Sequence, residues 1–256
     1  MIHPTAIICK SAEIDTSVVI GPYSVIGDNV NIAANTILES HVVVKKNTTI
    51  GINNKIYQFA SIGEDPQDLK FNDEETILTI GDNNVFREYC TINRGTVTGI
   101  NKTVIGSDNL FMTSSHVAHD CVIKNNCILS NAASLAGHVR LGNNVSLGGF
   151  TLVHQFCEIG DFAFSGLGTV ISRDVTPYTL VAGNHAQAYK INTAGLKRKG
   201  FHLDIIKGLE KTFKLLIKSK ASRDEVNAEL KELNLSYKEV EYFVNFIKNS
   251  ERGVTR

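Results

Sequence analysis

Aliphatic side chains recur at every sixth position along most of this chain. The first run comprises Ile2, Ile8, Ile14, Ile20, Ile26, Ile32, Leu38, Val44, Ile50, Ile56 and Ile62. After a polar, acidic stretch near residues 64–79, the same phase returns at Ile80, Phe86 and Ile92. The phase then slips by one residue, and a second run comprises Ile105, Phe111, Val117, Ile123, Leu129, Leu135, Leu141, Leu147, Val153, Ile159, Ser165 and Ile171.

A period of six is the signature of a parallel β-helix. Each of the 26 hexads supplies one short strand and a corner, and three hexads close one coil of 18 residues. A helical repeat is the competing interpretation, but a period of six matches neither 3.6 nor 7 residues. We therefore predict a mainly β chain with a hexapeptide-repeat solenoid over residues 1–177, interrupted by an insertion near residues 64–79.

The hexads stop after Pro177, and a different period follows. Capping boxes at residues 222–225 and 236–239 indicate helix starts. Apolar residues at helical spacing are Leu203, Ile206, Leu209, Phe213, Leu216 and Ile217. We predict a helical C-terminal domain over residues 178–256.

Charge separates the same two regions. The 256 residues carry 26 Lys and Arg against 26 Asp and Glu, which excludes a globally basic nucleic-acid binder. Residues 1–177 hold 11 basic and 17 acidic residues, a net of −6, whereas residues 178–256 hold 15 and 9, a net of +6. The dense run Lys197-Arg198-Lys199 suggests an anionic partner. We expect no membrane span and no signal peptide, because no stretch is apolar enough for either.

The cysteines fit the repeat better than they fit a metal site or disulfides. Cys90, Cys121, Cys127 and Cys157 each lie four residues after an inward aliphatic residue, where a small side chain belongs; only Cys9 does not. We expect them to be buried structural residues, and the odd count favours a reducing compartment.

Histidines provide the sharpest functional signal. His116, His119, His138 and His154 lie in the second run and avoid its inward and corner positions. Coil spacing places Asp120, His138 and His154 near one edge of successive coils. A group of imidazoles beside a carboxylate favours acid–base chemistry. Nucleophile elbow, Walker A and His-Glu-x-x-His motifs are absent from the sequence.

Longer motifs carry a resemblance to a known family. They are residues 40–44 (SHVVV), 56–64 (IYQFASIGE), 67–70 (QDLK), 115–121 (SHVAHDC), 135–139 (LAGHV), 153–157 (VHQFC), 183–186 (GNHA) and 195–201 (GLKRKGF). With these motifs the whole chain resembles the UDP-N-acetylglucosamine O-acyltransferase family of hexapeptide-repeat enzymes, which begins lipid A biosynthesis.

The resemblance implies a left-handed solenoid, a homotrimer and a cytoplasmic enzyme of a Gram-negative-type bacterium without a cofactor or metal. The enzyme would move an (R)-3-hydroxyacyl group from the acidic acyl carrier protein to the glucosamine 3-hydroxyl of UDP-N-acetylglucosamine. His119 would be the general base, Asp120 its orienting group and Gly137 an oxyanion donor. The resemblance places in the substrate cleft Gln67, Asp68, Lys70, His116, His138, His154 and Gln155, and at the nucleotide Asn192 and Arg198.

Two positions depart from the family pattern. Leu167 stands where long-chain enzymes have the glycine that ends the acyl tunnel, so we predict an acyl chain shorter than the 14-carbon type, about 10 or 12 carbons. Ala194 replaces an acidic residue that some relatives use near the ribose, which puts that contact in doubt.

Four alternatives stay open at this point. The related N-acyltransferase of the same pathway has an additional N-terminal domain, whereas the hexads here begin at Ile2. The acceptor could carry a 3-amino group in place of the 3-hydroxyl. A hexapeptide carbonic anhydrase would need three histidines on zinc, and a non-catalytic scaffold would give no reason for outward-facing, stacked histidines.

Overall fold

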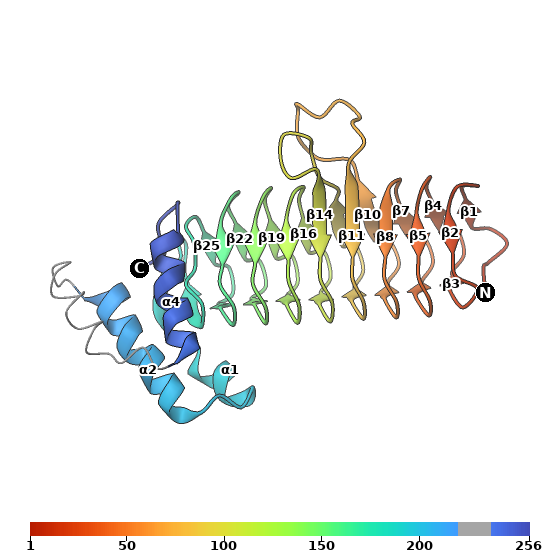
Figure 1. Cartoon of the computed structure of the whole chain (residues 1–256). Coiled ribbons are helices and arrows are strands. Elements are labelled where there is room, and N and C mark those ends of the chain that lie inside the picture. The colour runs from red at the N-terminus through yellow and green to blue at the C-terminus, as the bar shows by residue number, and fades with distance from the viewer. Residues whose placement is uncertain (220–236) are drawn as a thin grey trace.

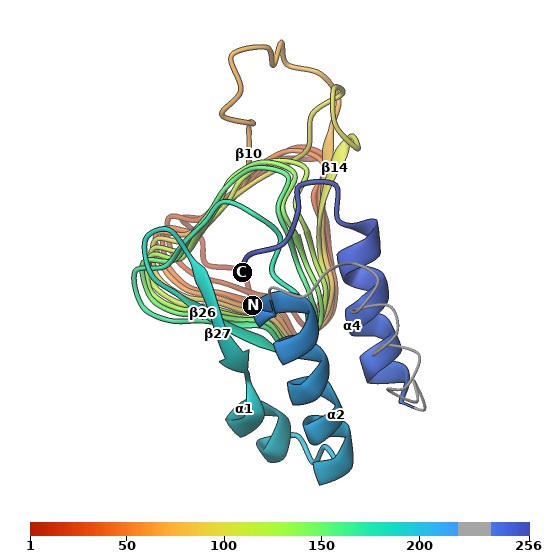
Figure 2. The ribbon, with the colours of Figure 1, turned by 90° about the vertical axis from the view of Figure 1, so that its left-hand side faces the viewer.

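The chain forms a parallel β-helix shaped as a three-sided prism, with helices at its C-terminal end (Figures 1 and 2). The computed structural model describes residues 1–219 and 237–256. Each coil gives one strand to each side of the prism, and each strand pairs in parallel with the strand one coil further on. The pairing of Ile8 with Ile26 and of Val117 with Leu135 confirms the 18-residue coil.

Three sheets result, and most of their strands contain only two residues. The first sheet comprises β1 (Ile7–Ile8), β4 (Val25–Ile26), β7 (Val43–Val44), β10 (Ser61–Glu64), β13 (Thr91–Asn93), β16 (His116–Val117), β19 (Ser134–Leu135), β22 (Leu152–Val153) and β25 (Val170–Ile171). The second sheet comprises β2 (Glu13–Ile14), β5 (Asn31–Ile32), β8 (Thr48–Ile50), β11 (Ile77–Ile80), β14 (Lys102–Ile105), β17 (Val122–Ile123), β20 (Arg140–Leu141) and β23 (Glu158–Ile159). The third sheet comprises β3 (Val19–Ile20), β6 (Ile37–Leu38), β9 (Lys55–Ile56), β12 (Val85–Phe86), β15 (Leu110–Phe111), β18 (Ile128–Leu129), β21 (Ser146–Leu147), β24 (Phe164–Ser165), β26 (Thr179–Ala182) and β27 (Gln187–Ile191).

The inward residue of each hexad from Ile20 onward points into the prism and is buried. Phe86 and Phe111 stack inside it with ring centroids 4.6 Å apart. Cys90, Cys121, Cys127 and Cys157 are buried and free, as expected for structural residues. Burial raises the pKa of the Cys121 thiol to about 12, so this thiol stays protonated and unreactive at neutral pH.

Corners impose a second regularity on the chain. In most hexads the residue three positions after the inward residue adopts a left-handed conformation, as at Asn53, Asn83 and Asn144, each with φ of 57°. Asn and Asp tolerate this conformation better than most residues. At the corner between the first and second sheets, the residues in this conformation include Asp120 (φ 59°), His138 (φ 63°) and Phe156 (φ 65°).

The coils are interrupted twice at that same corner (Figure 2). A first excursion, residues 65–76, leaves the prism between β10 and β11, where the polar insertion was predicted. A second excursion, residues 94–101, lies between β13 and β14. The sequence showed this second loop only as the one-residue phase slip after Ile92.

The tail packs against the last coils (Figure 1). Beyond Pro177, β26 extends the third sheet in parallel with β24, before α1 (Thr193–Arg198), α2 (Leu203–Phe213), the π-helix η1 (Lys214–Lys218) and α4 (Lys238–Asn249). The C-terminal segment then returns to the prism, where Val254 forms a β-bridge with Asp174. The capping boxes at 222–225 and Ser236 lie outside the described residues. In the part that is described, no helix has the length and apolarity needed to cross a membrane.

Candidate active site

The site is built around a His–Asp pair at the corner that follows β16. His119 Nδ1 lies 2.8 Å from Asp120 Oδ2, and the Asp120 side chain is fully buried whereas His119 is 14% exposed. Because a carboxylate only accepts hydrogen bonds, the Nδ1 of His119 carries the proton and donates it. In the neutral imidazole, the other ring nitrogen, Nε2, is then the one with a lone pair that can accept a proton.

The second excursion holds the Asp120 carboxylate. The Thr96 hydroxyl donates to Oδ2 at 2.7 Å, the Thr96 N–H lies 3.1 Å from the same atom, and the Ile100 N–H donates to Oδ1 at 2.9 Å. A Cβ on Gly99 would lie 2.3 Å from the Asp120 Cγ, so only glycine lets the loop wrap this closely. The loop therefore fixes the orientation of the group that orients His119.

These donors also set the ionisation of the pair. Burial alone would raise the pKa of Asp120, but the hydrogen bonds from His119, Thr96 and Ile100 outweigh it and lower the pKa below its ordinary value of 3.8. Asp120 is therefore an anion at neutral pH. Burial lowers the pKa of His138, so this neighbouring imidazole is neutral under the same conditions.

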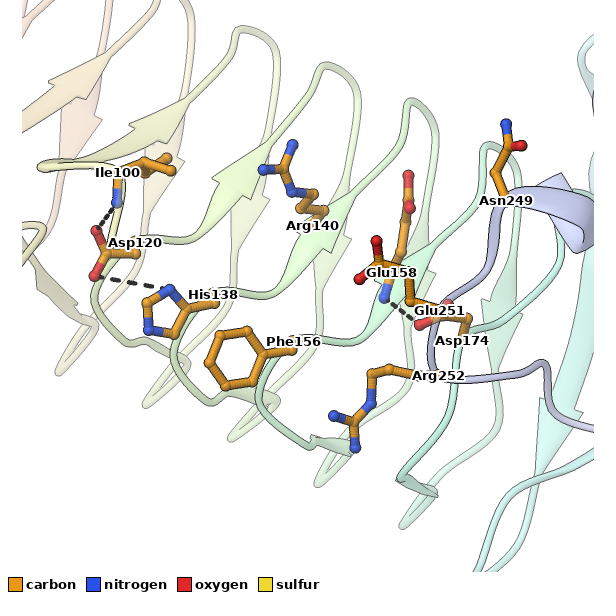
Figure 3. Close-up of a pocket in the computed structure, with 10 residues that line it drawn as sticks. All are labelled: Ile100, Asp120, His138, Arg140, Phe156, Glu158, Asp174, Asn249, Glu251 and Arg252. Carbon is orange, nitrogen blue, oxygen red and sulfur yellow. Dashed lines mark hydrogen bonds and ion pairs between the residues drawn. The ribbon is translucent and has the colours of Figure 1, made fainter. Parts of the chain in front are cut away.

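Two hollows meet at His138 and Phe156, whose rings stack at 4.4 Å and 8°. The first, the His119 cleft, has a volume of about 710 Å³ and is lined by Gln67, Asp68, Leu69, Lys70, Thr98, Gly99, His119, His138, Gln155 and Phe156. The second, of about 720 Å³, is lined by Ile100, Asp120, His138, Arg140, Phe156, Glu158, Asp174, Asn249, Glu251 and Arg252 (Figure 3). The first excursion thus forms one wall of the His119 cleft, and the C-terminal segment forms a wall of its neighbour.

Gly137 lies directly against the catalytic candidate. A Cβ at this position would come within 2.6 Å of Cε1 and 2.8 Å of Nε2 of His119. Any larger residue would displace the imidazole, so the backbone of residue 137 borders the nitrogen that is free to act as a base.

The other histidines of the sequence prediction lie outside this cleft. His116 Nδ1 is 2.8 Å from the Thr91 hydroxyl on the outer surface of the first sheet, and burial lowers its pKa. His154 precedes Phe156 by two residues, so Phe156 and not His154 continues the row of Asp120 and His138. His154 Nδ1 lies 3.3 Å from Arg252 Nη2, beside the C-terminal segment.

Leu167, Asn192 and Arg198 lie elsewhere on the prism. Leu167 is 83% exposed and follows β24, at the corner between the third and first sheets. The Asn192 side chain accepts from the Gly195 N–H and caps α1, whose last residue is Arg198. Figure 2 shows α1 on the opposite side of the prism from the two excursions. One chain does not bring these residues to its own His119.

One group of three potential metal ligands occurs among the described residues, namely His119, Asp120 and His138, with ligand atoms within 4.8 Å of one another. His138 Nδ1 is 4.0 Å from Asp120 Oδ2. Both Asp120 oxygens already accept N–H or O–H donors from Thr96, Ile100 and His119. A metal would have to break these hydrogen bonds, so the pair fits proton transfer better than metal binding.

Sequence reasoning missed several parts of this site. Thr96 and Ile100 were missed because the second excursion showed only as a phase slip. Phe156 was missed although it lies 18 residues after His138, and applying the coil spacing to residues of every type would have found it.

Comparisons with known proteins agree over the whole chain. A curated acyl-[acyl-carrier-protein]–UDP-N-acetylglucosamine O-acyltransferase from Psychrobacter sp. is 51% identical over 256 residues, which is 100% of this chain and 99% of the relative. The chain belongs to the UDP-N-acetylglucosamine O-acyltransferase family. The family model for domain 2 of these enzymes matches residues 174–255.

Solved structures of the family give the same result. The enzyme from Moraxella catarrhalis superposes with a TM-score of 0.96 at 47% identity, covering 100% of this chain and 99% of its own. The one from Acinetobacter baumannii also gives 0.96, at 45% identity and the same coverage. The predicted fold, a left-handed parallel β-helix with C-terminal helices, is confirmed by these family members.

The contacts of Thr96 generate a prediction about stability. Thr96→Val removes the hydroxyl donor and should lower the free energy of unfolding at neutral pH by about 2 kcal/mol, as expected for a buried hydrogen bond to a charged group. The pKa of Asp120 is lower in the folded chain, so this contribution is present above pH 3.8 and is lost as the pH falls through the folded pKa. Urea unfolding across this range should show the wild-type advantage shrinking in acid.

The exposed Thr49 of β8 provides the matched control, because Thr49→Val should cost little at any pH. If the wild-type advantage over Thr96→Val stayed constant into strong acid, the hydroxyl would not be acting on the carboxylate.

Proposed function

We propose that this chain transfers an (R)-3-hydroxyacyl group from acyl carrier protein to the glucosamine 3-hydroxyl of UDP-N-acetylglucosamine, the first step of lipid A biosynthesis. The observation that carries the proposal is the free Nε2 of a carboxylate-oriented His119 in a cleft that also contains Gln67, Asp68, Lys70 and Gln155. The Psychrobacter relative, an acyl-[acyl-carrier-protein]–UDP-N-acetylglucosamine O-acyltransferase, supports the choice of donor and acceptor.

The proposed acyl transfer uses both residues of the His119–Asp120 pair. Nε2 of His119 takes the proton of the 3-hydroxyl as that oxygen attacks the thioester carbonyl carbon. Asp120 stabilises the resulting imidazolium, and the N–H of Gly137 donates to the oxyanion of the tetrahedral intermediate. The C–S bond then breaks, and the carrier thiolate receives the proton from the imidazolium, which restores the base.

Substrate contacts are assigned by side-chain chemistry. Gln67, Asp68, Lys70, His138 and Gln155 offer donors and acceptors around the sugar within the His119 cleft. We assign His116 and His154 to the rim of the cleft, and Asn192 and Arg198 to the nucleotide. The basic tail suits an acidic carrier protein, and the buried, free cysteines fit the reducing bacterial cytoplasm.

A panel of hydroxyacyl thioesters of acyl carrier protein, offered with UDP-N-acetylglucosamine or its 3-amino analogue, tests this function. We expect O-acylation of the hydroxyl acceptor. His119→Ala should lower turnover by about 10² to 10⁴-fold, whereas the exposed His3→Ala should not change it. Acylation of the amino analogue alone, or near-normal turnover by His119→Ala, would overturn the assignment.

We further propose a homotrimer whose sites lie between subunits. A second copy would bring Leu167, Asn192 and Arg198 to a cleft that they do not reach within one chain. An exposed row of rings at the corner between the third and first sheets offers a contact surface: Tyr23, His41, Phe59 and Tyr89, with centroids 5.1–5.2 Å apart. Rows of exposed apolar groups are typical of interfaces.

Light scattering should give about three times the 28.0 kDa chain mass. Phe59→Asn combined with Tyr89→Asn should favour the monomer, because Asn accepts the left-handed corner conformation and removes only the rings. Asn53→Gly, at another corner, is the control and should stay trimeric. A monomeric wild type would contradict the trimer, and an unaffected double variant would contradict this contact surface.

Leu167 should limit the length of the acyl chain. Leu167→Gly should move the donor preference from chains of about 10 or 12 carbons towards the 14-carbon type, because it removes a bulky side chain from the end of the proposed tunnel. Ile52→Gly is the control, since Ile52 is also exposed and also lies two residues after an inward residue, but at the corner between the second and third sheets on a distant coil. The donor profile of each variant gives the result, and an unchanged profile for Leu167→Gly would refute the role.

A further inference from the structure

Arg94 is among the largest fully buried side chains of the described residues, with 1% of its surface exposed. It follows β13 directly, at the point where the chain leaves the first sheet for the second excursion. Burying a guanidinium is costly unless partners compensate for the lost water. Its contacts therefore indicate why a charge is kept at this position.

All of these contacts reach the first excursion or the strand before it. The Arg94 N–H donates to the Glu64 carbonyl at 3.1 Å, and Nη1 donates to the Gly63 carbonyl at 3.1 Å. Nη2 forms an ion pair with the Asp65 carboxylate. The guanidinium carbon also lies 5.5 Å from the centroid of the Phe71 ring, within reach of a cation–π interaction.

Asp65 and Phe71 bracket the part of the loop that lines the His119 cleft. Gln67, Asp68 and Lys70 lie between these two contacts, and all three line the cleft. Within this segment the Lys70 N–H donates to Asp68 Oδ1 at 3.0 Å and the Phe71 N–H to the Asp68 carbonyl at 3.0 Å. One guanidinium thus holds both ends of a turn that presents polar groups to the substrate.

The other ties between this excursion and the coils do not reach both ends of the segment that lines the cleft. Asn47 Nδ2 donates to Glu75 Oε2 at 2.6 Å, beyond the far end of that segment. Lys46 pairs with Asp73 at 2.7 Å, but the Asp73 side chain is 78% exposed, and exposed ion pairs contribute little. The neighbouring Asn93 amide donates to the Asp65 carbonyl at 2.6 Å, so it holds the Asp65 end of the segment but not the Phe71 end.

We propose that Arg94 is a positioning residue for substrate binding, and this inference rests on the proposed function. Because Arg94 is buried, it acts through the segment from Asp65 to Phe71 and not by touching the substrate. Substitution of Arg94 should therefore raise KM. It should leave kcat unchanged, because the His119–Asp120 pair is held by Thr96 and Ile100 and not by Arg94. An ammonium group lacks the planar fork needed to bond Gly63 and Asp65 while facing Phe71, so lysine should not replace arginine.

The experiment compares Arg94→Lys with Lys46→Gln, which removes the exposed ion pair to the same excursion. Arg94→Lys should raise KM for at least one substrate about tenfold, with kcat and the acid limb of the pH–rate profile retained, and Lys46→Gln should leave both parameters near wild type. Hydrogen exchange of a peptide spanning residues 65–76 should be faster in Arg94→Lys only.

Asp65→Asn keeps the test decisive if Arg94→Lys fails to fold. It removes only the half-exposed carboxylate and should raise KM in the same direction; added to a folded Arg94→Lys, it should have little further effect. A fall in kcat at constant KM, or unchanged KM and unchanged loop exchange in the variants, would overturn the positioning role. A different result would overturn the proposed function instead. In that case the wild-type chain would acylate neither sugar nucleotide, while hydrogen exchange of residues 65–76 would still be faster in Arg94→Lys.

Discussion

Hydrogen bonding between coils is the constraint on which the rest of this structure depends. Each strand pairs with the strand one coil away, at a separation of 18 residues in the regular coils, so a single extra residue within a coil would turn the following side chains out of register. Additional residues must leave the prism at a corner and return in phase. Both excursions do this at the corner between the first and second sheets, the corner that also carries Asp120 and His138 on the following coils.

The two excursions divide the work of the site. The second wraps the Asp120 carboxylate with the Thr96 hydroxyl and with backbone N–H groups, so it acts on the ionisation of Asp120 and, through Asp120, on the orientation of His119. The first presents Gln67, Asp68 and Lys70 to the cleft and is held by the buried Arg94. The second excursion therefore holds both parts of the site through different residues: its first residue, Arg94, contacts the first excursion, whereas Thr96 and Ile100 contact Asp120.

Much of the fold was readable from the sequence because a solenoid repeats a local rule. The inward aliphatic residues and the corner cysteines were predicted from spacing alone, since one coil contacts only its neighbours. The pairing of His119 with Asp120 was also predicted, from the resemblance to the family. The donors to Asp120 were not, because the hexad rule stops where the chain leaves the prism. Nor could spacing within one chain place Leu167, Asn192 and Arg198 relative to His119, since they lie on other sides of the prism.

The row that begins at Asp120 ends at a second buried aspartate. Asp120, His138, Phe156 and Asp174 follow one another at 18-residue intervals (Figure 3), and Asp174 accepts a 2.6 Å hydrogen bond from the Ser250 hydroxyl of the C-terminal segment. Coils stack about 4.8 Å apart. The distance from the His119–Asp120 pair to the anchor of the tail is therefore counted in whole coils, so it would change in discrete steps if coils were gained or lost.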